Sequence, residues 1–442
     1  MCFRAAWFAG CALLAGSLAA QDGNPGNDAL RGIDHNGRIP KAEIPAGLGH
    51  PDRWRYFPEG RLPQGDIFER FLITSFFSPL LFREADIGTG GGVAFTDVDF
   101  RNQRRQEFAN LVATRSSRGQ QTYALHWRRW TQHHEIPSGG VIQDERSYMH
   151  ATASYVRSLT SRYFGRGPNR PAAAQSSYTR ETSVARYTYQ FTEPNPADDW
   201  VFRVGASVEH NHLASGRVRH VLDTRTAYTR EFDRGNDHDL LWLNAHGRYD
   251  TRDSQHNPYR GWHLGATVNW AALQTGGDTG ALFSVGGSKV FTMPPLFHHG
   301  GDGHEEHPPT DSLALAAFVT LAAGNLPFYA LPSLGGSQTL RGYINGRWTD
   351  RSVWHAGAEY RFWVVPRGVR LTDWIRIERF GAALFVEAGQ VGGSLASLTR
   401  GTPKYSYGVG LRMSLERTAL FRYDLGFSEE GHVFSIAFGL SF

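Results

Sequence analysis

The last ten residues of the chain, 433-VFSIAFGLSF-442, decide the fold class. Large apolar side chains stand at every second position, and small or polar residues fill the positions between them. The apolar set is Phe434, Ile436, Phe438, Leu440 and Phe442. Successive side chains of a β-strand point to opposite faces, so this alternation predicts a strand with one face suited to lipid and one polar face.

The same alternation recurs through most of the chain, with charge on the face opposite the aromatic residues. About fifteen runs of at least eight residues show it, and turn-forming residues separate them. They begin near Ile87, Glu107, Gln120, Arg146, Tyr178, Trp200, Asp239, Arg260, Ala281, Ser312, Ser352, Phe380, Lys404, Ala419 and Val433. Bacterial outer-membrane barrels have an even number of strands, so we expect sixteen, with the remaining strand at 71–77 or at 217–230.

The composition favours a single large all-β structure. The 442 residues include 50 glycines and 13% aromatic residues, and the mean hydropathy is −0.40. A bundle of membrane-spanning helices is excluded, because each helix needs about 20 mostly apolar residues. A transmembrane strand needs only about ten residues, half of which can be polar. The expected fold is therefore a sixteen-stranded antiparallel transmembrane β-barrel.

The N-terminus predicts export. Residues 1–20 contain Arg4, an apolar run and small residues before Gln21, the pattern of a signal peptide. Residues 21–66 are expected to form an irregular periplasmic extension, and residues 67–442 the barrel. Both cysteines, Cys2 and Cys11, lie in the signal segment, so no disulfide, zinc site or thiol nucleophile is expected in the mature protein.

A weak repeat lies within the extension. Residues 36–43 and 59–66 both place a glycine, an apolar residue and an acid at the spacing of an EF-hand calcium loop. Gly32 and Arg55 stand where the first ligand would be, so both copies are degenerate. Two glycine-centred turns are the favoured interpretation, and whether residues 32–66 bind calcium is left open.

Motifs for catalysis and cofactor binding were sought along the chain. The patterns Gly-x-Ser-x-Gly and Gly-Lys do not occur, which removes the nucleophile elbow and the P-loop. The histidine-rich stretch 298–307 lacks the spacing of a helical zinc motif and is interpreted as a solvated loop. With three lysines and a net charge of +4, nucleic acid is not expected as a partner. We therefore expect no enzyme activity, no metal and no cofactor.

The most informative segment is 335-GGSQTLRGY-343, which lies in a long connection between the runs starting at Ser312 and Ser352. Together with 249-YDTRD-253, 385-FVEAG-389 and the terminal strand, it resembles the BamA/TamA-type outer-membrane assembly barrels, the bacterial surface antigen family. The resemblance implies a barrel whose sixth extracellular loop folds into the lumen. In that loop Arg341, followed by Gly342 and Tyr343, would meet Glu359 and Glu387 on the wall. Asp250, Arg252, Asp253 and Gly389 match other family positions.

The residues agree with that implication. Alternation places Glu359 and Glu387 on the polar face of neighbouring runs. A guanidinium presents a planar fork of donors that fits carboxylates, which lysine cannot reproduce. An ordinary ion pair within the lumen is the alternative to a loop-locking role. The family usually has Asp where Glu387 stands, so the pairing distance is an open point.

The resemblance implies assistance with the assembly, insertion or translocation of outer-membrane polypeptides or lipids. Family members of this kind carry POTRA domains of about 75 residues, and the 46 residues from 21 to 66 cannot hold one. The chain thus resembles a short, barrel-only branch. The aromatic ending at Phe438, Leu440 and Phe442 fits a β-signal read by the barrel assembly machinery during the chain's own insertion.

A passive channel is the alternative function. Arginines on the expected lumenal faces would make such a channel prefer anions. They are Arg203, Arg248, Arg361, Arg412 and Arg422. In either case the expected location is the outer membrane, with its lipids as surroundings. The sequence does not identify clients or solutes, or a separate protein that supplies periplasmic domains.

Overall fold

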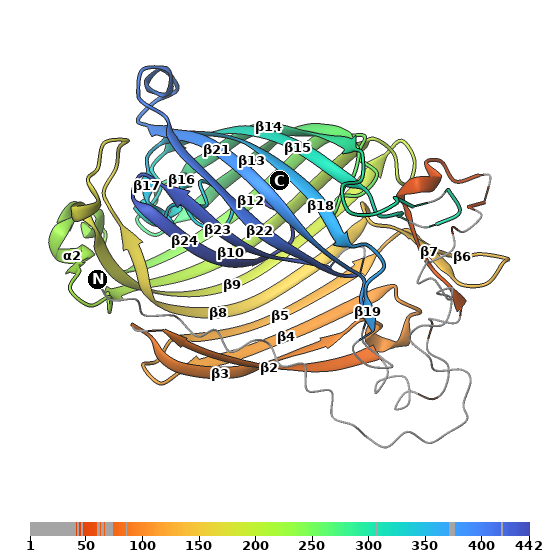
Figure 1. The fold of residues 1–442 in the computed structure, drawn as a ribbon. Coiled ribbons are helices and arrows are strands. Elements are labelled where there is room, and N and C mark those ends of the chain that lie inside the picture. Colours follow the sequence, from red (N-terminus) through yellow and green to blue (C-terminus); the bar gives the residue numbers. More distant parts are fainter. Residues whose placement is uncertain are drawn as a thin grey trace.

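A single large β-sheet dominates the computed structural model (Figure 1). The model describes residues 41, 44–45, 47–59, 62, 66, 74–84, 86–301, 303–305, 307–370, 376–416 and 419–442. The predicted signal peptide, nearly all of the first EF-hand-like copy and part of the second lie outside these residues. Within them, no helix is long and apolar enough to cross a membrane.

The sheet contains seventeen strands, sixteen of which are joined in chain order by antiparallel ladders. The sixteen are β2 (Ser75–Glu84), β3 (Gly88–Asp97), β4 (Glu107–Ser116), β5 (Gln121–Trp130), β8 (Tyr148–Tyr163), β9 (Ser176–Glu193), β10 (Trp200–Ser215), β12 (Asp237–Asp250), β13 (Gly261–Gln274), β14 (Gly280–Met293), β15 (Asp311–Gly324), β18 (Ser352–Val365), β21 (Arg379–Gly392), β22 (Lys404–Glu416), β23 (Ala419–Ser428) and β24 (Gly431–Phe438). The two-residue β11 (Leu222–Asp223) pairs parallel with β9. The all-β, antiparallel prediction is confirmed.

Every predicted run corresponds to a strand that starts within two residues of the expected position. Of the two candidates for the remaining strand, 71–77 overlaps the start of β2. The stretch 217–230 instead holds β11, the short helix α2 (Thr224–Ala227) and the start of the 3-10 helix η5 (Thr229–Phe232). Asp223 accepts a hydrogen bond from the Arg225 backbone N–H and so caps α2, which explains why this stretch turns instead of extending.

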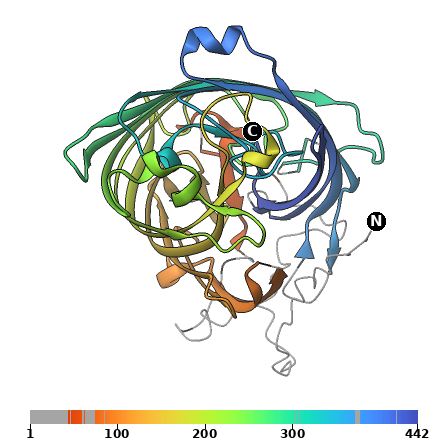
Figure 2. The same cartoon turned by 90° about the vertical axis from the view of Figure 1, so that its left-hand side faces the viewer.

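The sheet curves around its own axis, and Figure 2 looks into the end where α2 lies. Large apolar side chains on the outward face are exposed, whereas the inner face carries buried charge. The exposed set includes Leu125, Val204, Val208, Leu264, Val285, Leu384, Tyr407, Leu411 and Ile436. This is the arrangement that alternation predicts when the outward face meets an apolar phase.

The ladder series begins at β2 and ends at β24. The described residues of these two strands form ladders with β3 and β23, and no ladder between β2 and β24 is found among them. Figure 1 shows β2 and β24 as the two ends of the series. Closure into a sixteen-stranded barrel therefore stays a prediction.

The expectation that the apolar alternation continues to the C-terminus is wrong. It holds to Phe438, which is 61% exposed, and β24 ends there. Gly439 has a φ of +77°, a left-handed conformation that turns the chain. Leu440 then packs against Trp363 and Leu420, and the carbonyl oxygen of Phe442 accepts a hydrogen bond from Arg361 on the inner side at 2.9 Å.

Short elements lie in the connections at both ends of the sheet. At one end, β1 (Trp54–Phe57), β7 (Val141–Asp144) and β6 (His133–Glu135) form a three-stranded sheet, and β19 (Val369–Arg370) pairs with β20 (Arg376–Ile377). At the other end, β16 (Ser333–Leu334) pairs with β17 (Trp348–Thr349). The remaining 3-10 helices are η1 (Pro51–Arg53), η3 (Phe100–Asn102), η4 (Ala172–Ala174), η6 (Phe328–Ala330) and η7 (Leu395–Thr399).

The segment before the large sheet is more ordered than its sequence predicts. We call its described residues between 41 and 62 the N-terminal strap. Its strand β1 pairs with β7, and Trp54 is buried against Ile136, Ile142 and Ala197. Alternation over four residues is too short to predict such a strand, which exists because β7 supplies its hydrogen-bond partners.

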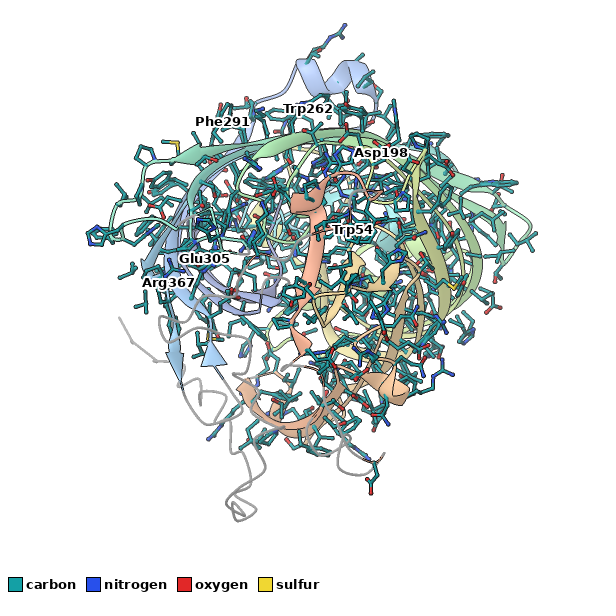
Figure 3. All side chains as sticks on the ribbon, turned by 90° about the vertical axis from the view of Figure 1, so that its right-hand side faces the viewer. Trp54, Asp198, Trp262, Phe291, Glu305 and Arg367 are labelled. Atoms are coloured by element: carbon teal, nitrogen blue, oxygen red, sulfur yellow. The ribbon has the colours of Figure 1, made fainter. Side chains whose placement is uncertain are left out.

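The strap spans the mouth of the curved sheet at the end where the chain enters β2. Figure 3 looks into this end and shows Trp54 within the mouth, with Trp262 and Phe291 on the outer rim. Arg53 donates to the carbonyl oxygen of Ala197 at 2.7 Å, and Asp52 pairs with Arg260 at 2.7 Å. The Lys41 backbone N–H donates to His304 at 2.8 Å. These contacts lie on the turns after β9, β12 and β14, so the strap bridges distant parts of the rim.

On the opposite side of the mouth, Glu59 holds the strap to the turn after β3. Its carboxylate pairs with Arg104 at 2.8 Å and accepts the Gly140 backbone N–H at 2.9 Å. The hydrogen bond from Arg104 lowers the pKa of Glu59. The acid that opens the second EF-hand-like copy is thus an ion-pair partner of the strap. No group of three or more metal-ligating side chains is found in the described part of the chain.

Candidate functional site

The candidate site is built around Arg341, in the connection between β15 and β18. Its side chain is buried and contacts three carboxylates on the inner face of the sheet. The Nε atom donates to Glu387 at 3.0 Å, and Nη1 donates to Glu359 at 2.7 Å and to Asp424 at 3.2 Å. The Arg341 backbone N–H also donates to Glu387 at 2.7 Å. We call Arg341, Glu359, Glu387 and Asp424 the Arg341 cluster.

The three carboxylates come from β18, β21 and β23, so one loop residue connects strands from the last part of the sheet. The Arg341 guanidinium carbon also lies 3.5 Å from the ring centroid of Phe385 on β21. A cation over an aromatic face adds attraction that strengthens when water is excluded. Buried charges are tolerated only when they are paired and hydrogen-bonded, and the Nε and Nη1 atoms of Arg341 meet both conditions.

Three wall arginines surround the cluster and pair with two of its carboxylates, Glu359 and Asp424. Arg361 pairs with Glu359 at 2.8 Å, and Arg412 pairs with Asp424 at 2.7 Å. Arg422 pairs with Asp424 at 2.8 Å and donates to the loop carbonyl of Ser337 at 2.6 Å. Ser406 donates to Glu387 at 2.8 Å. The inner wall of the sheet therefore contacts the loop through backbone as well as side-chain groups.

Glycines let the loop approach the wall at backbone distance. A Cβ atom on Gly342 would lie 2.3 Å from the carbonyl oxygen of Phe427, and one on Gly426 would lie 2.4 Å from that of Arg341. Both distances are shorter than any real contact, so neither position accepts a side chain. Gly389 has the same role opposite Leu334, whose Cδ1 would lie 2.9 Å from an added Cβ. The glycine after Arg341 is thus explained by close packing.

The other end of the loop is anchored by aromatic and charged side chains. Tyr343 is buried with Leu340 and Trp348, and its hydroxyl donates to Glu429 at 3.4 Å. Arg347 pairs with Glu430 at 2.7 Å and lies over the Trp348 ring. These contacts hold both ends of the loop segment against β21 to β24.

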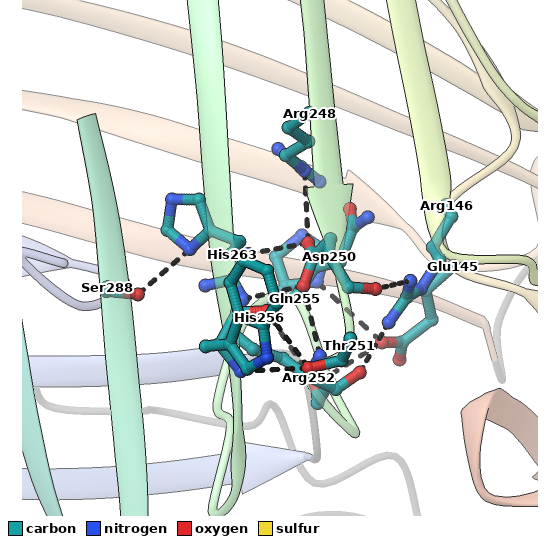
Figure 4. A network of polar contacts seen from close by, with 12 residues as sticks. Glu145, Arg146, Arg248, Asp250, Thr251, Arg252, Gln255, His256, His263 and Ser288 are labelled. Carbon is teal, nitrogen blue, oxygen red and sulfur yellow. Dashed lines mark hydrogen bonds and ion pairs between the residues drawn. The ribbon is translucent and has the colours of Figure 1, made fainter. Parts of the chain in front are cut away.

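The second family motif shapes a turn at the strap end of the molecule (Figure 4). Arg252 forms a two-pronged pair with Asp250, both bonds at 2.9 Å, and Arg248 adds a contact at 3.0 Å. Asp253 accepts backbone N–H groups of Ser254 and Tyr259, both at 3.0 Å. These carboxylates bond to neighbours within the turn, so the motif has a structural explanation.

Arg146 fastens this turn to the neighbouring ones. Its guanidinium donates to the backbone carbonyls of Asp250 at 2.6 Å and of Asp198 at 3.2 Å, and also to that of Arg252. A single buried arginine thereby joins the turn between β7 and β8 to the turns after β9 and β12. Sequence reasoning did not select it, because its partners are carbonyls that carry no sequence signal.

The structure brings together the predicted residues Arg341, Glu359 and Glu387, with Gly342 and Tyr343 beside them. Asp250, Arg252 and Asp253 lie in a separate network, and the C-terminal residues lie on β24 and beyond it. Asp424 was missed, although alternation in 419–428 places Asp424 opposite the aromatic residues and could have indicated it. The histidine stretch 298–307 is used locally: His298 lies 3.0 Å from Asp311, and His307 stacks on Tyr259.

A conservative change tests the geometry at Glu387. Shortening the side chain with Glu387→Asp withdraws the carboxylate from the backbone N–H and Nε of Arg341, both of which it contacts. We expect a loss of about 1–3 kcal/mol in the free energy of unfolding, the cost of buried charged donors left unpaired. Denaturant unfolding of the refolded protein measures it, with Glu135→Asp, on a carboxylate that is 68% exposed and distant from the loop, as the control. Equal midpoints for Glu387→Asp and the parent would contradict the prediction.

Comparison with known proteins identifies a family model that matches most of the chain and several solved structures with a similar fold. A family model described as the Omp85 superfamily domain matches residues 107–442. Similar solved structures include CdiB from Escherichia coli (10% identity, TM-score 0.52, 87% of this chain and 66% of that chain) and BamA from Haemophilus ducreyi lacking POTRA domains 1-3 (13%, 0.48, 83% and 70%). CdiB from Acinetobacter baumannii is another (10%, 0.45, 83% and 59%). This chain therefore spans less than two thirds of either CdiB chain. No curated protein matches it.

Proposed function

Because the chain belongs to the Omp85 superfamily, we propose that it is a non-enzymatic outer-membrane barrel that assists the assembly, insertion or translocation of outer-membrane polypeptides or lipids. The observation that carries the proposal is the match over residues 107–442, which includes the Arg341 loop and all its wall partners. In this proposal the sixteen antiparallel strands close into a barrel, and the Arg341 cluster locks the loop inside it.

The ends of the ladder series supply the mechanism. A client strand adds to an exposed strand edge through main-chain hydrogen bonds, so a weakly paired seam between β2 and β24 would offer such an edge without nucleotide hydrolysis. Pro79 in β2 lacks a backbone N–H, which suits an edge strand. The next two residues of β2, Leu80 and Leu81, lie opposite Gly92 and Gly91 on β3, which have no side chains to pack across the pair.

The alternative of an anion-preferring channel is less well supported. It needs unpaired positive charge on the inner face, but Arg361, Arg412 and Arg422 pair with the carboxylates of the Arg341 cluster. Arg248 pairs with Asp250. The strap also occupies one mouth of the sheet. These contacts favour an assembly role over a permanently open channel.

Photo-crosslinking in intact cells tests the proposal. A photoreactive phenylalanine analogue would replace Leu81 on β2 or Phe434 on β24, both exposed on the outward face. The matched controls are Leu264 on β13 and Val285 on β14, which are 56% and 57% exposed, between the values of the two seam positions, and lie far from the seam. We expect crosslinks to newly exported outer-membrane polypeptides at the two seam positions only, together with reduced levels of such proteins in a deletion strain.

Equal crosslinking at all four positions, or none at the seam, would contradict the assembly role. Steady anion-selective pores in planar bilayers, combined with normal outer-membrane protein levels in the deletion strain, would instead establish the channel.

A further inference from the structure

A fully buried carboxylate lies on the outward face of the sheet. Glu107 begins β4 on the same face as Leu111, which is 44% exposed, yet Glu107 itself is 0% exposed. Arg101 donates to it through Nε at 2.8 Å and through Nη2, and Arg129 donates at 3.1 Å. The indole N–H of Trp127 donates at 3.3 Å. An outward carboxylate beside apolar surface is stable only with such partners.

The cluster carries more positive than negative charge. Two guanidinium groups share one carboxylate, and their side chains remain 55% exposed for Arg101 and 41% exposed for Arg129. Each guanidinium has five donors, so the contacts with Glu107 leave donors on both arginines directed to the surface. Glu107 thus holds two arginines in place and leaves one net positive charge for a ligand. The fork geometry of arginine suits phosphate.

An apolar hollow begins beside the cluster. It has a volume of about 390 Å³ and is lined on the outward face by Trp127 and Leu125, with Ala151, Ala153 and Ala185 as its floor. A second hollow of about 530 Å³ shares Leu125, Ala153 and Ala185 and continues to Leu111. The alanines leave space between larger neighbours, and Trp127 belongs to both the hollow and the charged cluster.

We propose that this surface binds one anionic glycerophospholipid, with its phosphate on Arg101 and Arg129 and an acyl chain in the hollow. The inference rests on the proposed outer-membrane location. Arg129 and Leu125 are four residues apart, a rise of about 13 Å along a strand and, at a strand tilt of about 40°, about 10 Å along the membrane normal, which lies within one leaflet of about 15 Å. The cluster lies at the end where the chain enters β2, so the lipid belongs to the periplasmic leaflet.

The proposal gives each residue a distinct task. The positive charge attracts the phosphodiester, Trp127 lies at the level where aromatic side chains meet headgroups, and the alanine floor accepts a flexible chain. A lipid held here lies along β4, β5, β8 and β9, close to β2 and β3 in the ladder series. It would therefore sit near the proposed seam without forming part of it.

Native mass spectrometry of the full-length protein tests the site. The protein is released from vesicles of equal phosphatidylglycerol and phosphatidylcholine content, and retained lipids are counted. We expect the parent to retain phosphatidylglycerol preferentially and the Arg101→Gln/Arg129→Gln variant to retain about tenfold less, because two charge-assisted contacts are lost. The control is Arg115→Gln/Arg118→Gln, which removes two charges at the opposite end of β4.

A second variant separates the acyl chain from the phosphate. Ala153→Phe fills the hollow without altering charge, and its position on the outward surface leaves the inner packing untouched. We expect this variant to lose phosphatidylglycerol too. Sodium phosphate at about 50 mM should not displace the lipid from the parent. Displacement by free phosphate, or full retention by Ala153→Phe, would overturn the lipid assignment.

Retention by Arg101→Gln/Arg129→Gln at the parent level would also overturn it. The seam crosslinks distinguish this failure from failure of the proposed function. Loss of the seam crosslinks while the lipid is retained would contradict only the assembly role. Loss of the lipid preference while the parent shows normal crosslinks would contradict only the lipid site.

Discussion

Replacing Arg341 with alanine is expected to lower the free energy of unfolding by about 3–5 kcal/mol, the range for breaking a buried ion pair by removing one partner. Glu359 keeps Arg361, and Asp424 keeps Arg412 and Arg422. Glu387 loses the one guanidinium that contacts it in the described part of the chain. The penalty therefore concentrates on Glu387. Urea unfolding, followed by the mobility shift of the folded protein on gels, measures it.

A double variant identifies the source of that loss. Arg341→Ala combined with Glu387→Gln removes the uncompensated charge, so we expect it to recover part of the lost stability. Arg351→Ala is the matched control, since Arg351 lies on the same connection and donates to the carbonyls of Ala322 and Gly324 instead of carboxylates. Equal losses for Arg341→Ala and Arg351→Ala, or no recovery in the double variant, would contradict the assignment.

Removing Trp54 is expected to release the N-terminal strap and raise ion conductance across reconstituted bilayers. Trp54 is 2% exposed and holds β1 against Ile142 and Ala197, and truncating a buried tryptophan costs about 3–5 kcal/mol. That is more than an isolated four-residue strand can supply. Among the described residues, no member of the Trp54 cluster lies in a strand of the large sheet, so Trp54→Ala should leave the unfolding midpoint of that sheet unchanged.

Two measurements check the strap. Planar-bilayer recordings should show larger and more frequent openings for Trp54→Ala, and limited proteolysis should cleave residues 47–59 faster. Lys41→Gln serves as the control, because it removes only an exposed ion pair with Asp52. Conductance equal to that of the parent, with faster proteolysis, would show that the strap does not close the mouth.

The sequence predicted strand positions well because the apolar phase outside and the polar groups inside act on every residue of a spanning strand. The pattern at 404–414 or 419–428 therefore reports the face of each side chain directly. It failed after Phe438, where Gly439 redirects the chain into local packing with Trp363 and Leu420. The residues that follow no longer have a lipid side and an inner side.

The candidate site was predicted in part for the same reason. Arg341, Glu359 and Glu387 were found through a motif and a face assignment, and both depend on sequence alone. Asp424 was not predicted as part of the site. Its carboxylate pairs with Arg412 and Arg422, and the sequence does not distinguish it from other charges on the inner face until the position of the loop is known. Arg146 was invisible for a stronger reason: its partners are backbone carbonyls, which every residue carries.

By itself, the sequence determined the all-β class, the strand positions, the outward face of each strand and the arginine of the long loop. Those features follow from local periodicity, which each strand obeys independently of the others. Only the tertiary structure decided which charges share a cluster, how the strap crosses the mouth and where Glu107 gathers two arginines on the outer surface. These depend on contacts between residues far apart in the chain, and such contacts exist only after the strands have taken their register.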